Sequence, residues 1–170
     1  MVEGFRITLR KSFAQNPPQI KTMTTRKITI ADIDKLSKIF DDYRIFYEKK
    51  SDIKGAAKFL LERVSNNESE IFITENDTNE LVGFVQLYPI FSSTRMKKLW
   101  LLNDLFIDEN YRGKGISILL IDEAKNLCKE TDACGLILET ARSNKDGNNL
   151  YHKTGFSLDL EHNYFSWDND

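Results

Sequence analysis

The sequence has few of the residues that mark a secreted, metal-binding or membrane protein. It has two cysteines, Cys128 and Cys134, whose spacing fits neither a disulfide framework nor a zinc site. The two histidines, His152 and His162, stand apart and are expected on the surface. No apolar run approaches the roughly 18–20 residues that a membrane-spanning helix needs. We therefore expect reduced thiols, a cytoplasmic location, no bound metal and no membrane partner.

An excess of charge of one sign is also missing. The chain has 24 lysines and arginines against 26 aspartates and glutamates, for a net charge of −2. A protein that holds nucleic acid through its bulk charge needs a basic excess, so no nucleic-acid partner is expected. Internal repeats and low-complexity stretches are absent, and 170 residues suit one domain with its own core.

The first 22 residues differ in composition from the rest of the chain. They are basic and poor in acids, since Glu3 is their only acidic residue, and prolines stand at positions 17 and 18. Organelle-targeting segments have this composition, but so do extensions without such a role. We therefore treat residues 1–22 as an N-terminal extension of unknown role and predict one domain over residues 23–170.

Apolar spacing beyond residue 22 predicts alternating strands and helices. Helices are expected over 33–47, 53–64, 116–128 and 144–154. Strands are expected over 28–30, 71–74, 81–87, 99–107 and 136–138, and 156–160 and 164–167 are expected to close the sheet as a hairpin. Pro89 to Thr94 is expected to form a loop. This order predicts a single-domain α/β fold, with a mixed central β-sheet flanked by about four helices.

One glycine-containing stretch carries most of the functional information. It consists of Arg112, Gly113, Lys114, Gly115, Ile116 and Ser117, between an expected strand and an expected helix. Glycine lets the backbone approach a ligand, and a helix start presents unpaired N–H groups and partial positive charge. Together these features suit a pyrophosphate, although the same stretch also fits an ordinary tight turn. The Walker pattern is absent, and the dinucleotide fingerprint is incomplete.

Three segments of the chain resemble the GNAT superfamily of N-acetyltransferases. Residues 112–117 resemble its R-x-x-G-x-G/A signature, and residues 102–107 resemble its fourth strand. Asn144, Tyr151, Gly155 and Phe156 resemble its N-x-x-x-x-x-L-Y-x-x-x-G-F segment. The segments stand in family order over roughly residues 23–170, and the middle block looks closest to the polyamine and small-amine acetyltransferases. Ser117 departs from the signature, which has glycine or alanine at that position.

This resemblance implies that acetyl-CoA is the co-substrate, and that no metal is needed. Residues 112–117 would hold its pyrophosphate. Leu105, Phe106 and Ile107 would hold the pantetheine arm by strand-like hydrogen bonds, and Asn144 would contact the cofactor. The acetyl group would pass directly to a primary amine, without an acyl-enzyme.

Tyr151 matches the position of the general acid in this family. A phenol with a pKa near ~10 can protonate a departing thiolate, whose thiol has a pKa near ~8.5, only when hydrogen-bonded to it. Without the resemblance, a tyrosine on a short helix is more often a packing residue.

The base that deprotonates the amine is less clear from the sequence. Asn103 and Asp104 interrupt a buried apolar run, and burying a carboxylate without partners is costly. Asp104 is therefore either the base, acting through water, or a brace for a neighbouring loop. Related amine acetyltransferases often carry glutamate at the position of Asn103, which cannot act as a base. Glu139 is a second candidate, and it fits a surface carboxylate equally well.

The sequence is compatible with several classes of acceptor. Aromatic residues at the end of the first expected helix, among them Tyr43, Phe46 and Tyr47, would suit a cationic amine but would equally serve a core. A small-molecule amine such as a polyamine or amino acid is our leading hypothesis. The alternatives are a protein lysine or N-terminus, and a non-catalytic acyl-CoA sensor. The resemblance also suggests a homodimer.

Overall fold

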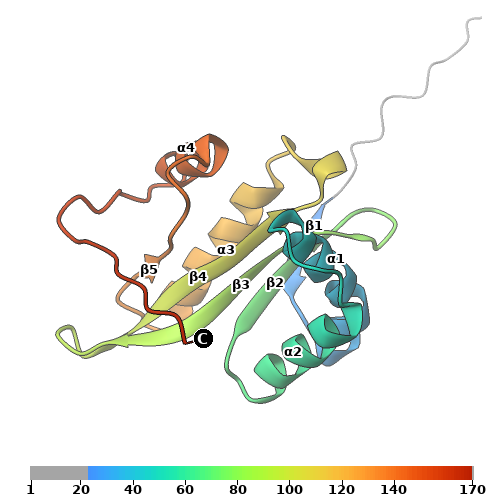
Figure 1. Ribbon diagram of the computed structural model, residues 1–170, viewed down its shortest axis with the longest axis horizontal. Helices are drawn as coiled ribbons and strands as arrows, with labels where there is room; N and C mark the ends of the chain where they lie inside the picture. The colour runs from blue at the N-terminus through green and yellow to red at the C-terminus, as the bar shows by residue number, and fades with distance from the viewer. Residues whose placement is uncertain (1–22, 170) are drawn as a thin grey trace, which may run out of the picture.

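A computed structural model describes residues 23–169, so the predicted extension at 1–22 lies outside the described residues. The strands are β1 (Thr24–Lys27), β2 (Glu70–Glu75), β3 (Leu81–Ser92), β4 (Lys97–Ile107) and β5 (Leu136–Ile137). The helices are α1 (Ile33–Phe46), α2 (Ile53–Ser65), α3 (Ile116–Glu130) and α4 (Lys145–Lys153), with short 3₁₀ turns at Ile30–Asp32 and Glu109–Tyr111. The predicted α/β fold with a mixed sheet and four flanking helices is confirmed (Figure 1).

The sheet has the strand order β1-β2-β3-β4-β5. β1 to β4 are antiparallel, and β5 runs parallel to β4. β3 and β4 pair along almost their whole length, from Gly83 opposite Ile107 to Ser92 opposite Lys97. β5 is paired with β4 only at residues 100 and 101. On the edge of β4 that faces away from β3, residues 103 to 107 therefore have no strand beside them.

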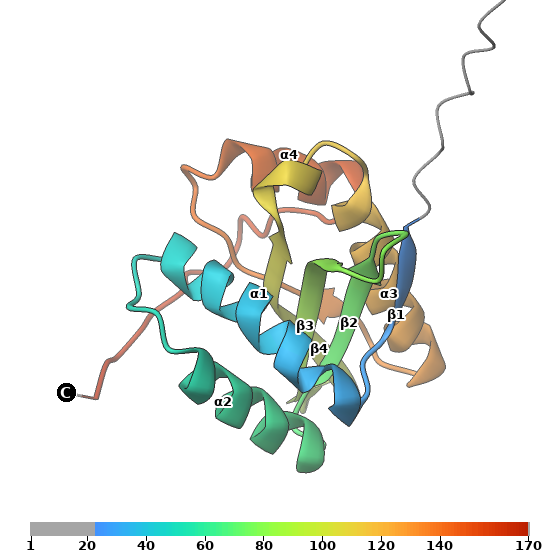
Figure 2. The ribbon, with the colours of Figure 1, turned by 90° about the vertical axis from the view of Figure 1, so that its right-hand side faces the viewer.

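Helices cover both faces of the sheet (Figure 2). α1 and α2 pack on one face, where Leu36, Leu60 and Phe84 are fully buried. α3 packs on the other face, over a cluster that includes Val85 and Leu120. Phe84 and Val85 are neighbours on β3 and point into opposite cores, because side chains alternate across a strand.

The first strand lies earlier than predicted. β1 ends at Lys27, and Ile30 begins a 3₁₀ turn and is 62% exposed, so the predicted strand over 28–30 is wrong. The cause is Asp32, whose carboxylate accepts hydrogen bonds from the Thr29 N–H (2.7 Å) and hydroxyl (2.9 Å). These bonds turn the chain where apolar alternation alone would extend it.

The predicted loop from Pro89 to Thr94 is also wrong over most of its length, since β3 continues to Ser92. Pro89 lies opposite Trp100, whose N–H donates to Gly135 O (3.1 Å) and so points away from β3. In an antiparallel ladder such a pair exchanges no hydrogen bonds. The missing N–H of the proline therefore costs no ladder bond at this position.

The hairpin predicted over 156–160 and 164–167 does not form, and residues 156–169 contain no strand. A strand needs a neighbour to pair with, and β5 offers only two residues. Asp159 also bends the segment, because its carboxylate accepts hydrogen bonds from the N–H groups of Glu161 (2.9 Å) and His162 (3.1 Å). Apolar alternation therefore overestimates strand content here.

A buried carboxylate fixes the connection between α1 and α2. Asp41 is 2% exposed and accepts hydrogen bonds from Ser51 Oγ (2.6 Å), Asp52 N (2.8 Å) and Arg44 Nη1 (2.9 Å). These bonds lower the pKa of Asp41, with the Asp52 N–H as the largest cause. Asp52 in turn caps α2 by accepting from Gly55 N (2.8 Å).

We expect Asp41→Ala to lower the free energy of unfolding by about 2 kcal/mol at pH 7, because it leaves buried donors without a partner. Since the folded-state pKa of Asp41 is lowered, its contribution is present above the unfolded pKa of about 3.9 and is lost as the pH falls through the folded value. Urea unfolding of wild type and variant should therefore differ at pH 7 and converge in acid. Asp42→Ala, an exposed neighbour on α1, is the control; an equal loss in that variant would contradict the assignment.

Candidate active site

The glycine loop leads from the turn at Glu109–Tyr111 into α3. Gly113 has φ 74° and Gly115, the N-cap of α3, has φ 81°. Both values lie in the left-handed region, which other residues reach only with strain. A Cβ built at either glycine would meet no atom within 4 Å, so the space beside both is open. No side chain of these two glycines therefore covers the backbone where a ligand can approach.

Unpaired N–H groups line this loop. The first N–H of α3 with a hydrogen-bond acceptor is that of Ile118, which donates to Gly115 O (3.0 Å). Among the described residues, nothing accepts from the N–H groups of residues 113–117. Gly115 has no side chain to cap the helix, and Ser117 adds only a small, half-buried side chain. Clustered donors at a helix start form an anion site.

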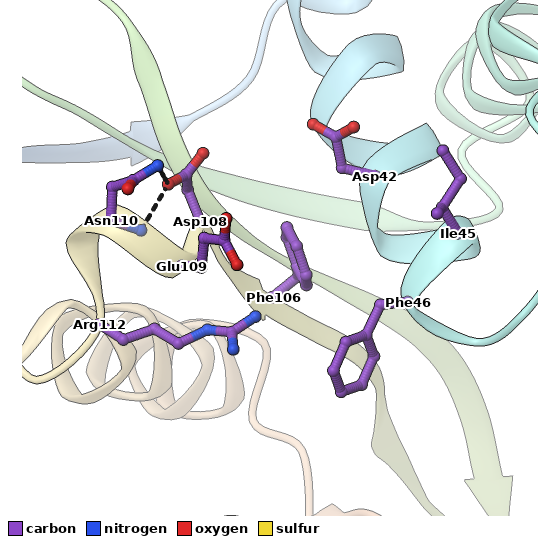
Figure 3. A pocket seen from close by; sticks show the side chains of 8 residues that line it. All are labelled: Asp42, Ile45, Phe46, Phe106, Asp108, Glu109, Asn110 and Arg112. Atoms are coloured by element: carbon purple, nitrogen blue, oxygen red, sulfur yellow. Dashed lines mark hydrogen bonds between the residues drawn. The ribbon is translucent and has the colours of Figure 1, made fainter.

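The two cationic side chains of the loop, Arg112 and Lys114, both contact other groups of the protein. Arg112 Nε donates to Ile107 O (3.1 Å), and its guanidinium lies over the rings of Phe46 and Phe106. Figure 3 shows Arg112 extending from the loop toward Phe106, with Phe46 across from it. Lys114 Nζ donates to Asn110 O (2.8 Å) and lies over the Tyr111 ring. The anion site is therefore built from backbone, with Arg112 directed toward β4.

Arg112 also borders a pocket that the sequence did not indicate. This pocket of about 330 Å³ lies between α1 and the turn before the glycine loop. Three of its lining residues are acids, Asp42, Asp108 and Glu109 (Figure 3). Although Asp42 is largely exposed, its pKa is raised, first by partial loss of solvent around it and then by Asp41 and Asp108. Asp42 is distant in sequence from the other two acids, so only the fold brings them together.

The unpaired edge of β4 presents backbone groups. Asp108 N–H donates to Val82 O (2.9 Å), so the alternation of the ladder turns the main chains of Leu105 and Ile107 away from β3. Phe106 has the opposite orientation: its main chain faces β3, and its ring packs against Tyr43 at 5.9 Å. Arg112 already binds Ile107 O. Leu105 N–H and C=O and Ile107 N–H therefore face the open edge.

A larger pocket lies where β4 and β5 part. Its volume is about 630 Å³, and it is formed by α1, β4, the stretch after β5 and the C-terminal segment. Its lining residues are Tyr43, Tyr47, Leu101, Leu102, Asn103, Glu139, Thr140, Ala141 and Tyr164. Of the predicted candidates for the base, Glu139 lines this pocket and Asp104 lies behind its wall.

Asp104 is 6% exposed and bonded on two sides. Its carboxylate accepts from Tyr43 Oη (2.7 Å) and from Asn103 Nδ2 (3.1 Å to each oxygen). Burial raises the pKa of Asp104, and the hydrogen bonds from Tyr43 and Asn103 oppose that rise. The bond to Tyr43 spans 61 residues of sequence and could not be found from local patterns. The partner of Asp104 is thus helix α1 and not a loop.

Tyr151 lies on α4, and Asn144 is the N-cap of the same helix. Tyr151 is half-buried, packs edge-on against Phe156 at 5.8 Å, and its hydroxyl has no hydrogen-bond partner among residues 23–169. Burial, and then Tyr47, raise the pKa of Tyr151. Asn144 caps α4 by accepting from Gly147 N (3.0 Å), and its Nδ2 donates to Thr140 Oγ1 (2.9 Å). The side chain of Asn144 therefore holds α4 against the pocket wall.

Residues 35–156 match the Acetyltransferase (GNAT) family. The chain belongs to this family. It is 39% identical over 137 residues to YhfO, an uncharacterised N-acetyltransferase of Bacillus subtilis (strain 168), covering 81% of this chain and 91% of that one. It is 33% identical over 79 residues to the streptothricin acetyltransferase of Escherichia coli, covering 46% and 42% of the two chains. The crystal structure of a probable acetyltransferase superposes with a TM-score of 0.82 at 32% identity, over 86% of this chain and 98% of that one.

This acetyltransferase is therefore an acyltransferase enzyme, and GNAT acetyltransferases use acetyl-CoA. Over residues 23–169, no cluster of histidine, cysteine, aspartate and glutamate is arranged to hold a metal ion. No helix in the same range is long and apolar enough to cross a membrane. Cys128 and Cys134 are both free thiols, and His162 is exposed and pairs with Asp159.

Proposed function

We propose that this GNAT acetyltransferase moves the acetyl group of acetyl-CoA to the primary amine of a small molecule, such as a polyamine or an amino acid. The observation that carries the proposal is the 630 Å³ pocket at the open edge of β4, which has Tyr43, Tyr47 and Glu139 in its walls. Its size is that of a small-ligand site. The similarity of part of the chain to a streptothricin acetyltransferase supports a small acceptor.

The residues present fit acetyl-CoA. The free N–H groups of residues 113–117 suit the pyrophosphate, and the free backbone groups of Leu105 and Ile107 suit the amides of the pantetheine arm. Both sites suit one extended ligand, because Arg112 at the start of the glycine loop contacts Ile107 O at the end of β4. When bound, acetyl-CoA supplies an activated acetyl group at the pocket where β4 and β5 part. A free N–H on this edge would stabilise negative charge on the thioester oxygen.

Asp104 and Tyr151 supply the proton transfers in this proposal. An alkylammonium with a pKa near ~10.4 must lose a proton before it attacks, and Asp104 is the buried carboxylate beside the pocket. Its raised pKa makes it a better proton acceptor than an ordinary aspartate. Tyr151 keeps its proton at neutral pH, since its pKa is raised, and would give it to the leaving thiolate only through a direct hydrogen bond. No acyl-enzyme is required.

Release of free thiol from acetyl-CoA, measured across a panel of acceptors, tests the proposal. The panel contains polyamines, amino acids, aminoglycosides and lysine peptides, with a reaction lacking acceptor as the control. We expect release that depends on a small-molecule amine. Release with peptides alone would instead indicate a protein acceptor. No release with any acceptor, together with tight acetyl-CoA binding, would indicate an acyl-CoA sensor.

A further inference from the structure

Tyr43 connects the pocket to the buried carboxylate. Its side chain lines the 630 Å³ pocket, and its hydroxyl donates to Asp104 Oδ1 at 2.7 Å. Asp104 does not line the pocket, so an acceptor molecule there meets Tyr43 first. Asn103 also lines the pocket and bonds Asp104, but an amide N–H cannot pass a proton on as a hydroxyl can.

The ring of Tyr43 is held in place on several sides. Phe84 and Phe106 pack edge-on against it, with centroids 5.7 and 5.9 Å away, and Tyr47 packs on it at 5.1 Å. Phe40, one turn earlier on α1, lies 5.9 Å away. A hydroxyl on a ring packed this closely keeps one position, which proton transfer requires.

We propose that Tyr43 is a further catalytic residue, which relays the proton of the acceptor amine to Asp104. This rests on the proposed function. In the step, an N–H bond of the ammonium breaks and its proton passes to Tyr43 Oη, while Tyr43 passes its own proton to the Asp104 carboxylate. The neutral amine then attacks the thioester carbonyl, and the C–S bond breaks. The second amine proton replaces the one that Tyr151 gives to the thiolate, and Asp104 later releases its proton to solvent.

The surroundings leave Asp104 as the group that titrates in this relay. The titratable groups around the pair are Tyr47 at the C-terminal end of α1, Tyr88 of β3 and Tyr151 of α4, with Glu139 across the pocket. Burial raises the pKa of Tyr88 to about 12 and raises the pKa of Tyr43 further, with Asp104 contributing to both. The phenols of Tyr43 and Tyr88 therefore stay protonated at neutral pH, which the relay needs of Tyr43.

The test compares Tyr43→Phe with wild type on two acceptors at pH 7. One is an alkylamine, which is charged at this pH, and the other is 2,2,2-trifluoroethylamine, which is mostly neutral. We expect kcat of the variant to fall roughly 30-fold with the alkylamine, which must lose its proton on the enzyme. With trifluoroethylamine the fall should be under about 3-fold, because no proton needs to be relayed. The alkylamine deficit should likewise shrink as the pH approaches the pKa of that amine.

Tyr88→Phe is the matched control, since it removes a half-buried phenol near Asp104 that has no hydrogen bond to it. Its kcat should match wild type with both amines. A Tyr43→Phe deficit of equal size for the two amines would show a structural role and overturn the relay. So would full activity of Tyr43→Phe, which would indicate a path through Glu139 or water. Wild-type turnover is measured first, because its absence would refute the proposed function itself.

Discussion

Gly115→Glu should abolish acetyl-CoA binding. The side chain would enter the open space beside the glycine loop, where the free N–H groups of residues 113–117 gather. Its carboxylate would take the place of the pyrophosphate and repel it. The backbone at φ 81° would also be strained, at roughly 1–2 kcal/mol. We expect the Kd measured by calorimetry to rise by more than about 100-fold, which corresponds to about 2.7 kcal/mol.

Gly115→Ala separates the two effects. Alanine carries the same backbone strain but adds neither charge nor bulk, so its affinity should fall by only about tenfold. Thermal unfolding of both variants shows whether the fold is kept. A Gly115→Glu protein that is folded and binds acetyl-CoA as wild type does would refute the assignment of the pyrophosphate to this loop.

The second large effect is expected at Tyr151. Tyr151→Phe keeps the ring that packs on Phe156 and removes only the hydroxyl, which has no partner among the described residues. The leaving thiolate would lose its proton donor, so kcat should fall roughly 100-fold. The Kd of acetyl-CoA should stay within a factor of about two. Steady-state kinetics and calorimetry on the same preparation measure both quantities.

His152→Ala provides the control for α4, because His152 is the exposed neighbour of Tyr151 on the same helix. Its kcat and affinity should equal those of wild type. If Tyr151→Phe instead loses affinity as much as turnover, Tyr151 is a binding residue and another group protonates the thiolate.

Local patterns predicted most of the fold. α1, α2 and α3 lie where apolar spacing placed them, and so does β4, because each buries one continuous face. The glycine loop was also predictable from the sequence, since Gly113 and Gly115 directly precede a helix. The failures share a cause. The end of β1 depends on the hydrogen bonds of Thr29 to Asp32, the length of β3 on which side of the strand Pro89 faces, and the C-terminal strands on a partner that β5 does not provide.

The candidate site was predictable only in part. The sequence indicated the glycine loop, Asp104 and Tyr151, each of which stands in a recognisable local motif. It indicated Tyr43 only as an aromatic candidate for the acceptor site and missed its bond to Asp104, because that bond joins residues that are distant in the chain. Nor did it show that Arg112 would turn toward Phe46 and Phe106, since both rings reach it only through packing. Side-chain partnerships across elements are set by tertiary structure and leave no periodic signal.

The short pairing of β5 with β4 has a consequence for how long the protein resists degradation. β5 is paired with β4 at two residue pairs, and α4 follows it. A ligand hydrogen-bonded along the rest of that edge would complete the sheet and would bind the native state alone. At a concentration 100 times its Kd, such a ligand adds about 2.7 kcal/mol to the free energy of unfolding. The concentration of acetyl-CoA would then set the resistance of the protein to proteolysis as well as its catalytic rate. When acetyl-CoA is scarce, the enzyme would be degraded faster.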